Sequence, residues 1–111
     1  MDSWQKKDLK HIWHPFTQAK DHEKWPPILI ERAKGLKLWD SDGKFYYDTI
    51  SSWWCNVHGH NHPKINKAIN NQLKSLEHVL FAGFTHRAVI ELTEKLVKIM
   101  PRNLTKVFYS D

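Results

Sequence analysis

The chain has 111 residues, of which 41% are hydrophobic and 26% are charged. This composition is typical of one small globular domain or of part of a larger one, and it excludes an intrinsically disordered chain. The formal net charge is +5. Acidic residues interrupt the basic ones and no run of five basic residues occurs, so we expect no nucleic-acid partner.

The sequence also argues against a membrane span and against an internal disulfide bond. It contains no apolar stretch of the roughly 18 residues that a membrane span needs, and its N-terminus lacks the apolar core of a signal peptide. We therefore expect a cytoplasmic protein with no membrane partner. A single cysteine, Cys55, excludes an internal disulfide and a cysteine-rich zinc site. We expect this thiol to be partly buried.

The first half of the chain predicts an arm followed by a small sheet. Residues 1–27 are rich in aromatic side chains and end in Pro26 and Pro27, so we expect an irregular N-terminal arm. Segments rich in β-forming residues follow at 28–33, 36–40 and 44–50. Gly35 separates the first two segments, and Gly43 supplies the positive-φ residue for a tight turn before the third. This pattern predicts a three-stranded antiparallel meander.

Two helices and a final strand are expected in the second half. Pro63 suits a first helical turn, and the apolar residues after it recur at helical spacing, which predicts a helix over 63–76. Thr85 is expected to cap a second helix that ends before Pro101. Residues 105–110 carry β-forming side chains and predict a strand. Because a strand needs a neighbour, we expect this chain to be a truncated part of a larger fold.

The segment SSWWCNVHGHNHP, residues 51–63, carries the side chains best suited to chemistry. Its histidines occupy alternate positions: His58, His60 and His62. On an extended backbone they would face one side, as zinc binding requires. Gly59 and Asn61 instead favour a turn, and no further ligand is suitably spaced. We favour a loop that enters the helix and assign no metal site, with zinc as the alternative.

Catalytic patterns are weak. Ser51 or Ser52 with His58 and Asp48 would make a hydrolytic triad, but the G-x-S-x-G elbow is absent. Glycines occur singly, so there is no glycine-rich phosphate loop. These patterns assign no catalytic or cofactor-binding residue to this chain.

Five short motifs occur in this chain in the order and spacing that they have in one protein family. They are HIWHPF (11–16), SSWW (51–54), HGHNHP (58–63), FAGFTH (81–86) and VFYSD (107–111). From about residue 10 onward the chain is similar to the N-terminal quarter of class III pyridoxal-phosphate aminotransferases. HIWHP and SSWW point to the biotin-pathway members of this class, because other members share mainly the meander, the G-x-x-H-P turn and the helices.

The resemblance implies an α/β fold, that of the fold-type I pyridoxal-phosphate-dependent transferases. It also implies that the full enzyme is a homodimer. Residues 1–27 would be the arm, residues 28–104 the first segment of the small domain with its linking helices, and residues 105–111 the truncated start of the large cofactor-binding domain. Pyridoxal 5'-phosphate and the catalytic lysine would belong to parts beyond this chain, so the chain alone would be inactive.

The activity implied is transfer of an amino group from S-adenosylmethionine to 8-amino-7-oxononanoate, which gives 7,8-diaminononanoate. Trp53 would line the cleft for the aliphatic keto acid, because an indole buries methylene groups and still offers an N–H. Trp54, on the opposite side of an extended backbone, would be a substrate contact or core. Phe16 stands where many relatives carry tyrosine, which leaves lysine open as the amino donor. Two further hypotheses are another class III ω-amino acid aminotransferase and a non-enzymatic interaction module.

Overall fold

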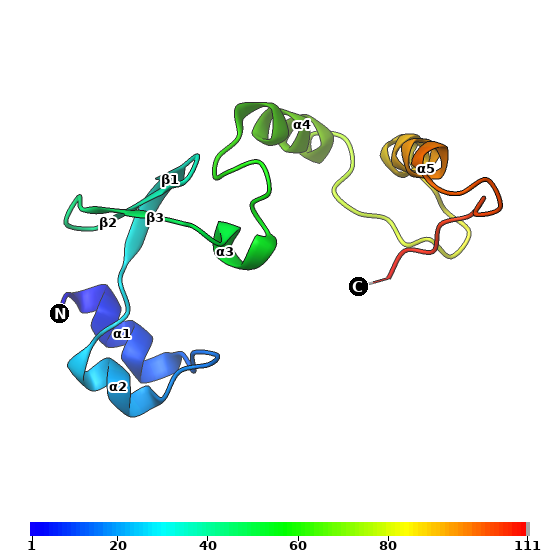
Figure 1. The fold of residues 1–111 in the computed structure, drawn as a ribbon. Helices are drawn as coiled ribbons and strands as arrows, with labels where there is room; N and C mark the ends of the chain where they lie inside the picture. The colour runs from blue at the N-terminus through cyan, green and yellow to red at the C-terminus, as the bar shows by residue number, and fades with distance from the viewer. Residues whose placement is uncertain (111) are drawn as a thin grey trace. The chain divides into compact units, whose positions relative to one another are not determined.

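The computed structural model describes residues 1–110. Asp111, the last residue of the expected segment 105–111, lies outside the described residues. The chain divides into two units, the first ending at Lys67 and the second beginning at Ala68 (Figure 1). No helix in the described part of the chain is long and apolar enough to cross a membrane.

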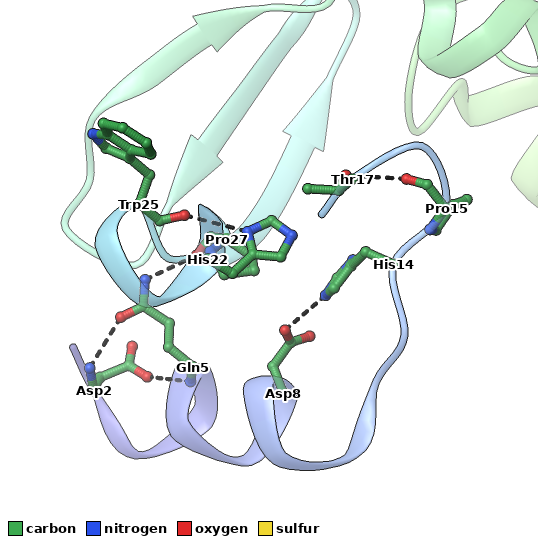
Figure 2. Close-up of polar contacts among 9 residues, drawn as sticks. All are labelled: Asp2, Gln5, Asp8, His14, Pro15, Thr17, His22, Trp25 and Pro27. Atoms are coloured by element: carbon green, nitrogen blue, oxygen red, sulfur yellow. Dashed lines mark hydrogen bonds and ion pairs between the residues drawn. The ribbon is translucent and has the colours of Figure 1, made fainter. Parts of the chain in front are cut away.

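The N-terminal arm contains two helices, so the expectation of an irregular arm is wrong. They are α1 (Ser3–His11) and α2 (Ala19–Lys24). A reciprocal cap starts α1: the Asp2 carboxylate accepts the Gln5 backbone N–H at 2.8 Å, and the Gln5 side chain accepts the Asp2 N–H at 3.0 Å (Figure 2). Such a cap satisfies two backbone donors that a helix start otherwise leaves free. The Gln5 amide also donates to the Pro27 carbonyl at 2.9 Å, which ties α1 to the end of the arm.

Between these helices the chain is held by a histidine that follows α1. His14 Nε2 lies 2.7 Å from the Asp8 carboxylate (Figure 2), and the His14 ring meets the His22 ring edge-on at 4.9 Å. These contacts fix the turn that presents Phe16, whose φ is 54°.

A three-stranded antiparallel meander follows the arm, as predicted. The strands, labelled in Figure 1, are β1 (Ile30–Lys34), β2 (Lys37–Asp40) and β3 (Phe45–Tyr47). Their order in the sheet is β1-β2-β3. Leu38 pairs with Ala33 on one side and Tyr46 on the other. The Asp40 carboxylate accepts the Lys44 N–H at 2.8 Å and the Tyr46 hydroxyl at 2.9 Å, closing the turn between β2 and β3. The third strand is shorter than the predicted 44–50: it ends at Tyr47, and the chain turns at residues 49–50.

Both predicted helices of the second half are present. They are α4 (Pro63–Leu73) and α5 (Arg87–Ile99). The first ends before residue 76, where the Gln72 amide donates to the Leu76 carbonyl at 2.7 Å in a closing turn. The cap of α5 is His86, whose Nδ1 accepts the Val89 N–H at 3.4 Å, and not Thr85. An imidazole nitrogen supplies the acceptor that the sequence pattern assigned to the threonine hydroxyl.

The strand expected at 105–110 does not form. These residues adopt neither helix nor strand. Strand pairing needs a neighbouring edge, and the described part of the second unit contains no strand. The segment is held through Tyr109, whose hydroxyl lies 3.0 Å from Thr93 Oγ1 of α5.

Burial of apolar side chains is incomplete throughout the described residues. No hydrophobic side chain is fully buried, and large ones such as Ile69, Leu92 and Phe108 are exposed. A folded domain of this length normally buries well over half of the surface of its unfolded chain. The chain therefore has the apolar surface of a segment that packs within a larger structure.

Candidate functional site

Asp48 is the anchor of the candidate site. It follows β3, its backbone N–H donates to the Leu36 carbonyl at 2.8 Å, and it is 8% exposed. Its Oδ1 accepts the Ser52 backbone N–H at 2.9 Å, and its Oδ2 accepts the Ser52 hydroxyl at 2.7 Å. His60 Nε2 lies 2.7 Å from the same Oδ2.

These hydrogen bonds determine the charge of the carboxylate. The bonds from the Ser52 backbone and hydroxyl, and then the bond from His60, lower the pKa of Asp48 from 3.8 to about 2. Asp48 is therefore ionised at neutral pH. Because an ionised carboxylate only accepts hydrogen bonds, His60 Nε2 bears a hydrogen and donates a hydrogen bond to Asp48 Oδ2.

His60 is positioned by a close crossing of two backbone segments. The Gly35 N–H donates to the His60 carbonyl at 3.0 Å, and the His60 N–H donates to the Gly35 carbonyl at 2.9 Å. Beside this bridge, a Cβ on Gly59 would lie 3.0 Å from the Gly35 Cα, and the φ of Gly59 is +77°. A glycine is needed here both for the left-handed backbone and for the close approach. The turn predicted from Gly59 is confirmed.

The histidines do not gather around a shared point. His60 is committed to Asp48, whereas the rings of His58 and His62 meet edge-on at 6.1 Å. Among residues 1–110 no group of three histidine, cysteine or carboxylate side chains is placed to hold a metal ion.

The hydrolytic triad considered from the sequence is also not arranged for catalysis. A serine nucleophile must donate to a histidine that is in turn oriented by a carboxylate. Here the Ser52 hydroxyl donates to Asp48, and Asp48 lies between it and His60. His60, and not His58, is the partner of the carboxylate. The three side chains therefore form a structural network without a serine–histidine bond.

The tryptophan pair lies on a left-handed turn, labelled α3 (Ser51–Trp54). The φ values of these four residues are 51°, 48°, 61° and 66° in chain order. The expectation that Trp53 and Trp54 lie on opposite sides of an extended backbone is therefore wrong. Left-handed backbone costs about 1–2 kcal/mol per non-glycine residue, so the surrounding contacts must hold it. The two hydrogen bonds from Ser52 to Asp48 are such contacts.

Trp53 and Phe16, both predicted from the sequence as substrate-binding residues, contact each other in the structure. Their ring centroids are 5.2 Å apart at an angle of 82°, an edge-to-face contact. Trp53 is 52% exposed and Phe16 is 92% exposed, so the pair keeps apolar surface available for a ligand. Trp54 is 80% exposed and is not core. Cys55, expected to be partly buried, is exposed as well.

A separate apolar groove of about 390 Å³ lies in the arm, between α1 and the residues before β1. Trp4, Ile12 and Ile28 are among the residues that line it. Neither aromatic residue of the Phe16–Trp53 pair lines this groove, so it is not part of the candidate site.

The described residues do not form a phosphate site for pyridoxal phosphate. Phosphate binding of that kind uses successive backbone N–H groups at a glycine-rich turn before a helix. The glycines here lie singly, and Gly35 and Gly59 are occupied in packing against each other. A cofactor would have to be held elsewhere in the protein.

Comparison with known proteins identifies the family. Residues 17–111 match the family Aminotransferase class-III. The chain belongs to this family. It is 48% identical, over all of its 111 residues, to the adenosylmethionine-8-amino-7-oxononanoate aminotransferase of Aquifex aeolicus, of which it covers 24%. It is also 48% identical over 105 residues to the enzyme of that name from Staphylococcus aureus, covering 95% of this chain and 23% of that protein.

Solved structures of class III aminotransferases agree with the fold. The crystal structure of adenosylmethionine-8-amino-7-oxononanoate aminotransferase from Methanocaldococcus jannaschii matches with a TM-score of 0.89 and 43% identity, over 96% of this chain and 24% of that one. The omega transaminase from Pseudomonas jessenii in complex with PMP matches with a TM-score of 0.82 and 34% identity, over 90% and 22%. The expected fold is confirmed: the chain has the structure of the N-terminal part of these pyridoxal-phosphate-dependent transferases. It spans about a quarter of the length of the curated relatives it matches.

Proposed function

We propose that the protein carrying this chain is the biotin-pathway aminotransferase, which transfers an amino group from S-adenosylmethionine to 8-amino-7-oxononanoate and yields 7,8-diaminononanoate. The observation that carries this proposal is the 48% identity along the whole chain to a relative of that name. The 34% identity to the omega transaminase, over less of the chain, gives weaker support to a different acceptor. Membership of a catalytic family argues against a non-enzymatic interaction module.

The aromatic pair supplies the apolar surface that this acceptor needs. The keto acid is a nine-carbon aliphatic chain, and each methylene group removed from water contributes about 0.8 kcal/mol. Trp53, held edge-on against Phe16, presents a half-exposed indole for such a chain. Trp54 adds exposed aromatic surface on the same turn. We propose that these three side chains bind substrate and that none of them is catalytic.

The cofactor and the quaternary structure belong to the same proposal. Pyridoxal 5'-phosphate, when bound, supplies the electron sink for amino transfer. Since the described residues offer no phosphate cradle, we propose that it is held by parts of the protein outside this chain, together with the catalytic lysine. A cytoplasmic homodimer is proposed from the resemblance to the family.

Lysine is the alternative amino donor. Phe16 has no hydroxyl, and its ring is engaged with Trp53, so this position offers no hydrogen-bond donor to an amino-acid ligand. The absence of that donor removes one means of favouring adenosylmethionine over lysine.

The test is complementation followed by an assay. The full-length gene should restore growth of a bacterium that lacks the biotin-pathway aminotransferase. The purified protein should aminate 8-amino-7-oxononanoate with adenosylmethionine, and a parallel reaction with lysine decides the donor. Activity on simple ω-amino acids without activity on 8-amino-7-oxononanoate would exclude the proposal and favour the general ω-transaminase.

A further inference from the structure

We propose that Asp48, Ser52 and His60 are positioning residues that hold Trp53 at the substrate cleft. The assignment of a cleft rests on the proposed function, but the positioning of Trp53 does not. One continuous path of contacts runs from the sheet through His60 and Asp48 to the left-handed turn that carries the indole.

The path begins where His60 is held at two points. Its backbone exchanges two hydrogen bonds with Gly35, at 3.0 and 2.9 Å, which fixes its main chain against the turn between β1 and β2. Its ring reaches the Asp48 carboxylate at 2.7 Å. Loss of the ring would leave this main-chain bridge in place, so the contribution of the side chain can be tested separately.

Asp48 transmits this constraint to the turn. It is the one side chain in the described residues that is both charged and buried, at 8% exposed. Its two oxygens accept three hydrogen bonds, two from Ser52 and one from His60. A carboxylate shared in this way cannot rotate toward one partner without breaking a bond to the other.

Ser52 converts the constraint into a backbone conformation. The Ser52 backbone N–H and hydroxyl both donate hydrogen bonds to the Asp48 carboxylate. Ser52 itself has φ 48° and ψ 55°. Trp53 follows directly, with φ 61° and ψ 51°, and its ring then meets Phe16 at 5.2 Å. Without the hydrogen bonds between Ser52 and Asp48, the turn can relax to ordinary backbone angles. The Trp53 indole then moves away from Phe16.

The role proposed for the network is positional. The polar atoms that join Asp48, Ser52 and His60 hold these three residues together, and in this role the network acts on substrate only through Trp53. This separates a positioning role from a catalytic one. Removal of a positioning residue should raise the KM for the keto acid and leave kcat almost unchanged.

The structural test uses 5-fluorotryptophan incorporated into the full-length protein, with the Trp53 fluorine signal assigned by its loss in Trp53→Phe. His60→Ala should shift or broaden the Trp53 signal, together with that of Trp54 on the same turn, and leave the signals of tryptophans outside this turn, such as Trp4 and Trp25, in place. His60→Gln, whose amide nitrogen can donate in place of Nε2, should restore the signal toward that of the wild type. His58→Ala is the matched control, because His58 contacts His62 and not Asp48, and it should have no effect.

The kinetic test is a double-mutant cycle. His60→Ala should raise the KM for 8-amino-7-oxononanoate about tenfold with kcat within about twofold. Combined with Trp53→Ala, it should add nothing beyond the effect of Trp53→Ala alone, because both changes remove the same contact. Additive effects would show that His60 acts independently of Trp53 and would overturn the inference.

Failure of the inference and failure of the proposed function give different results. If the protein does not aminate 8-amino-7-oxononanoate, the proposed function fails, while the fluorine signal still decides the positioning. If His60→Ala does not fold, Ser52→Ala removes a single hydroxyl and is read in the same way. An unchanged Trp53 signal in every folded variant of the network would overturn the inference even in an active enzyme.

Discussion

Gly59→Ala tests the close backbone crossing that positions His60. The new Cβ would lie 3.0 Å from the Gly35 Cα and 3.2 Å from both the Gly35 carbonyl carbon and its oxygen. These neighbours are backbone atoms, so they cannot move aside as a flexible side chain would. The φ of +77° adds a second cost for any residue with a Cβ.

The expected magnitude follows from these two terms. Left-handed backbone costs alanine about 1–2 kcal/mol, and overpacking against fixed neighbours costs about 1–3 kcal/mol. Together they reduce the free energy of opening the crossing by about 2 to 5 kcal/mol. At roughly 1.4 kcal/mol per tenfold, the backbone amides of Gly35 and His60 should then exchange hydrogen at least about 30-fold faster.

Hydrogen exchange of the full-length protein, followed by mass spectrometry on peptides spanning these two amides, measures the effect. Gly43→Ala is the matched control, because Gly43 has a similar φ of +81° but a Cβ added there would meet nothing within 4 Å. Gly43→Ala should lower stability only through the cost of left-handed backbone, about 1–2 kcal/mol, and only at the turn between β2 and β3. If the Gly35 and His60 amides exchange hydrogen at the same rate in Gly59→Ala as in Gly43→Ala, the reasoning from the close approach is refuted.

Three further predictions concern the candidate site itself. Trp53→Ala should raise the KM for the keto acid about 15-fold, the loss of contact with about two methylene groups at 0.8 kcal/mol each; Trp25→Ala, a change to another exposed tryptophan, should leave KM unchanged in the same steady-state assay. Phe16→Leu removes the edge-to-face contact, worth about 0.5–1.5 kcal/mol, and should raise this KM about 2- to 13-fold; an unchanged value would show that the aromatic contact does not position Trp53. Because its pKa is lowered from 3.8 to about 2, ionised Asp48 stabilises the fold fully above pH 4 and progressively less as the pH falls toward 2. The melting-temperature difference between wild type and Asp48→Asn should therefore narrow below about pH 4 in calorimetry, and a constant difference would contradict the lowered pKa.

Signals that act within a few residues were readable from the sequence. The Gly43 turn and the β-forming segments around it predict the meander, because a tight turn brings adjacent strands together without help from distant residues. Pro63 and the apolar spacing after it predict α4 for the same local reason. The Asp2–Gln5 cap of α1 is equally local, but it was outweighed by the aromatic content of the arm, which led to the wrong expectation of an irregular segment.

Trp53 and Phe16 were identified as candidate substrate contacts through the resemblance to the family. Their contact with each other was not part of that prediction. It depends on the turn after α1, held by His14 and Asp8, and on a left-handed turn that a tryptophan does not normally favour. No spacing pattern along the chain indicates either feature.

The sequence by itself determined the meander, the approximate positions of the two later helices and the family. Only the tertiary structure decided that Asp48 binds His60, and that Trp53 faces Phe16. The reason is physical. Hydrogen bonds within a turn depend on neighbouring residues, whereas the partner of a buried carboxylate depends on where two distant backbones cross, here at Gly35 and Gly59.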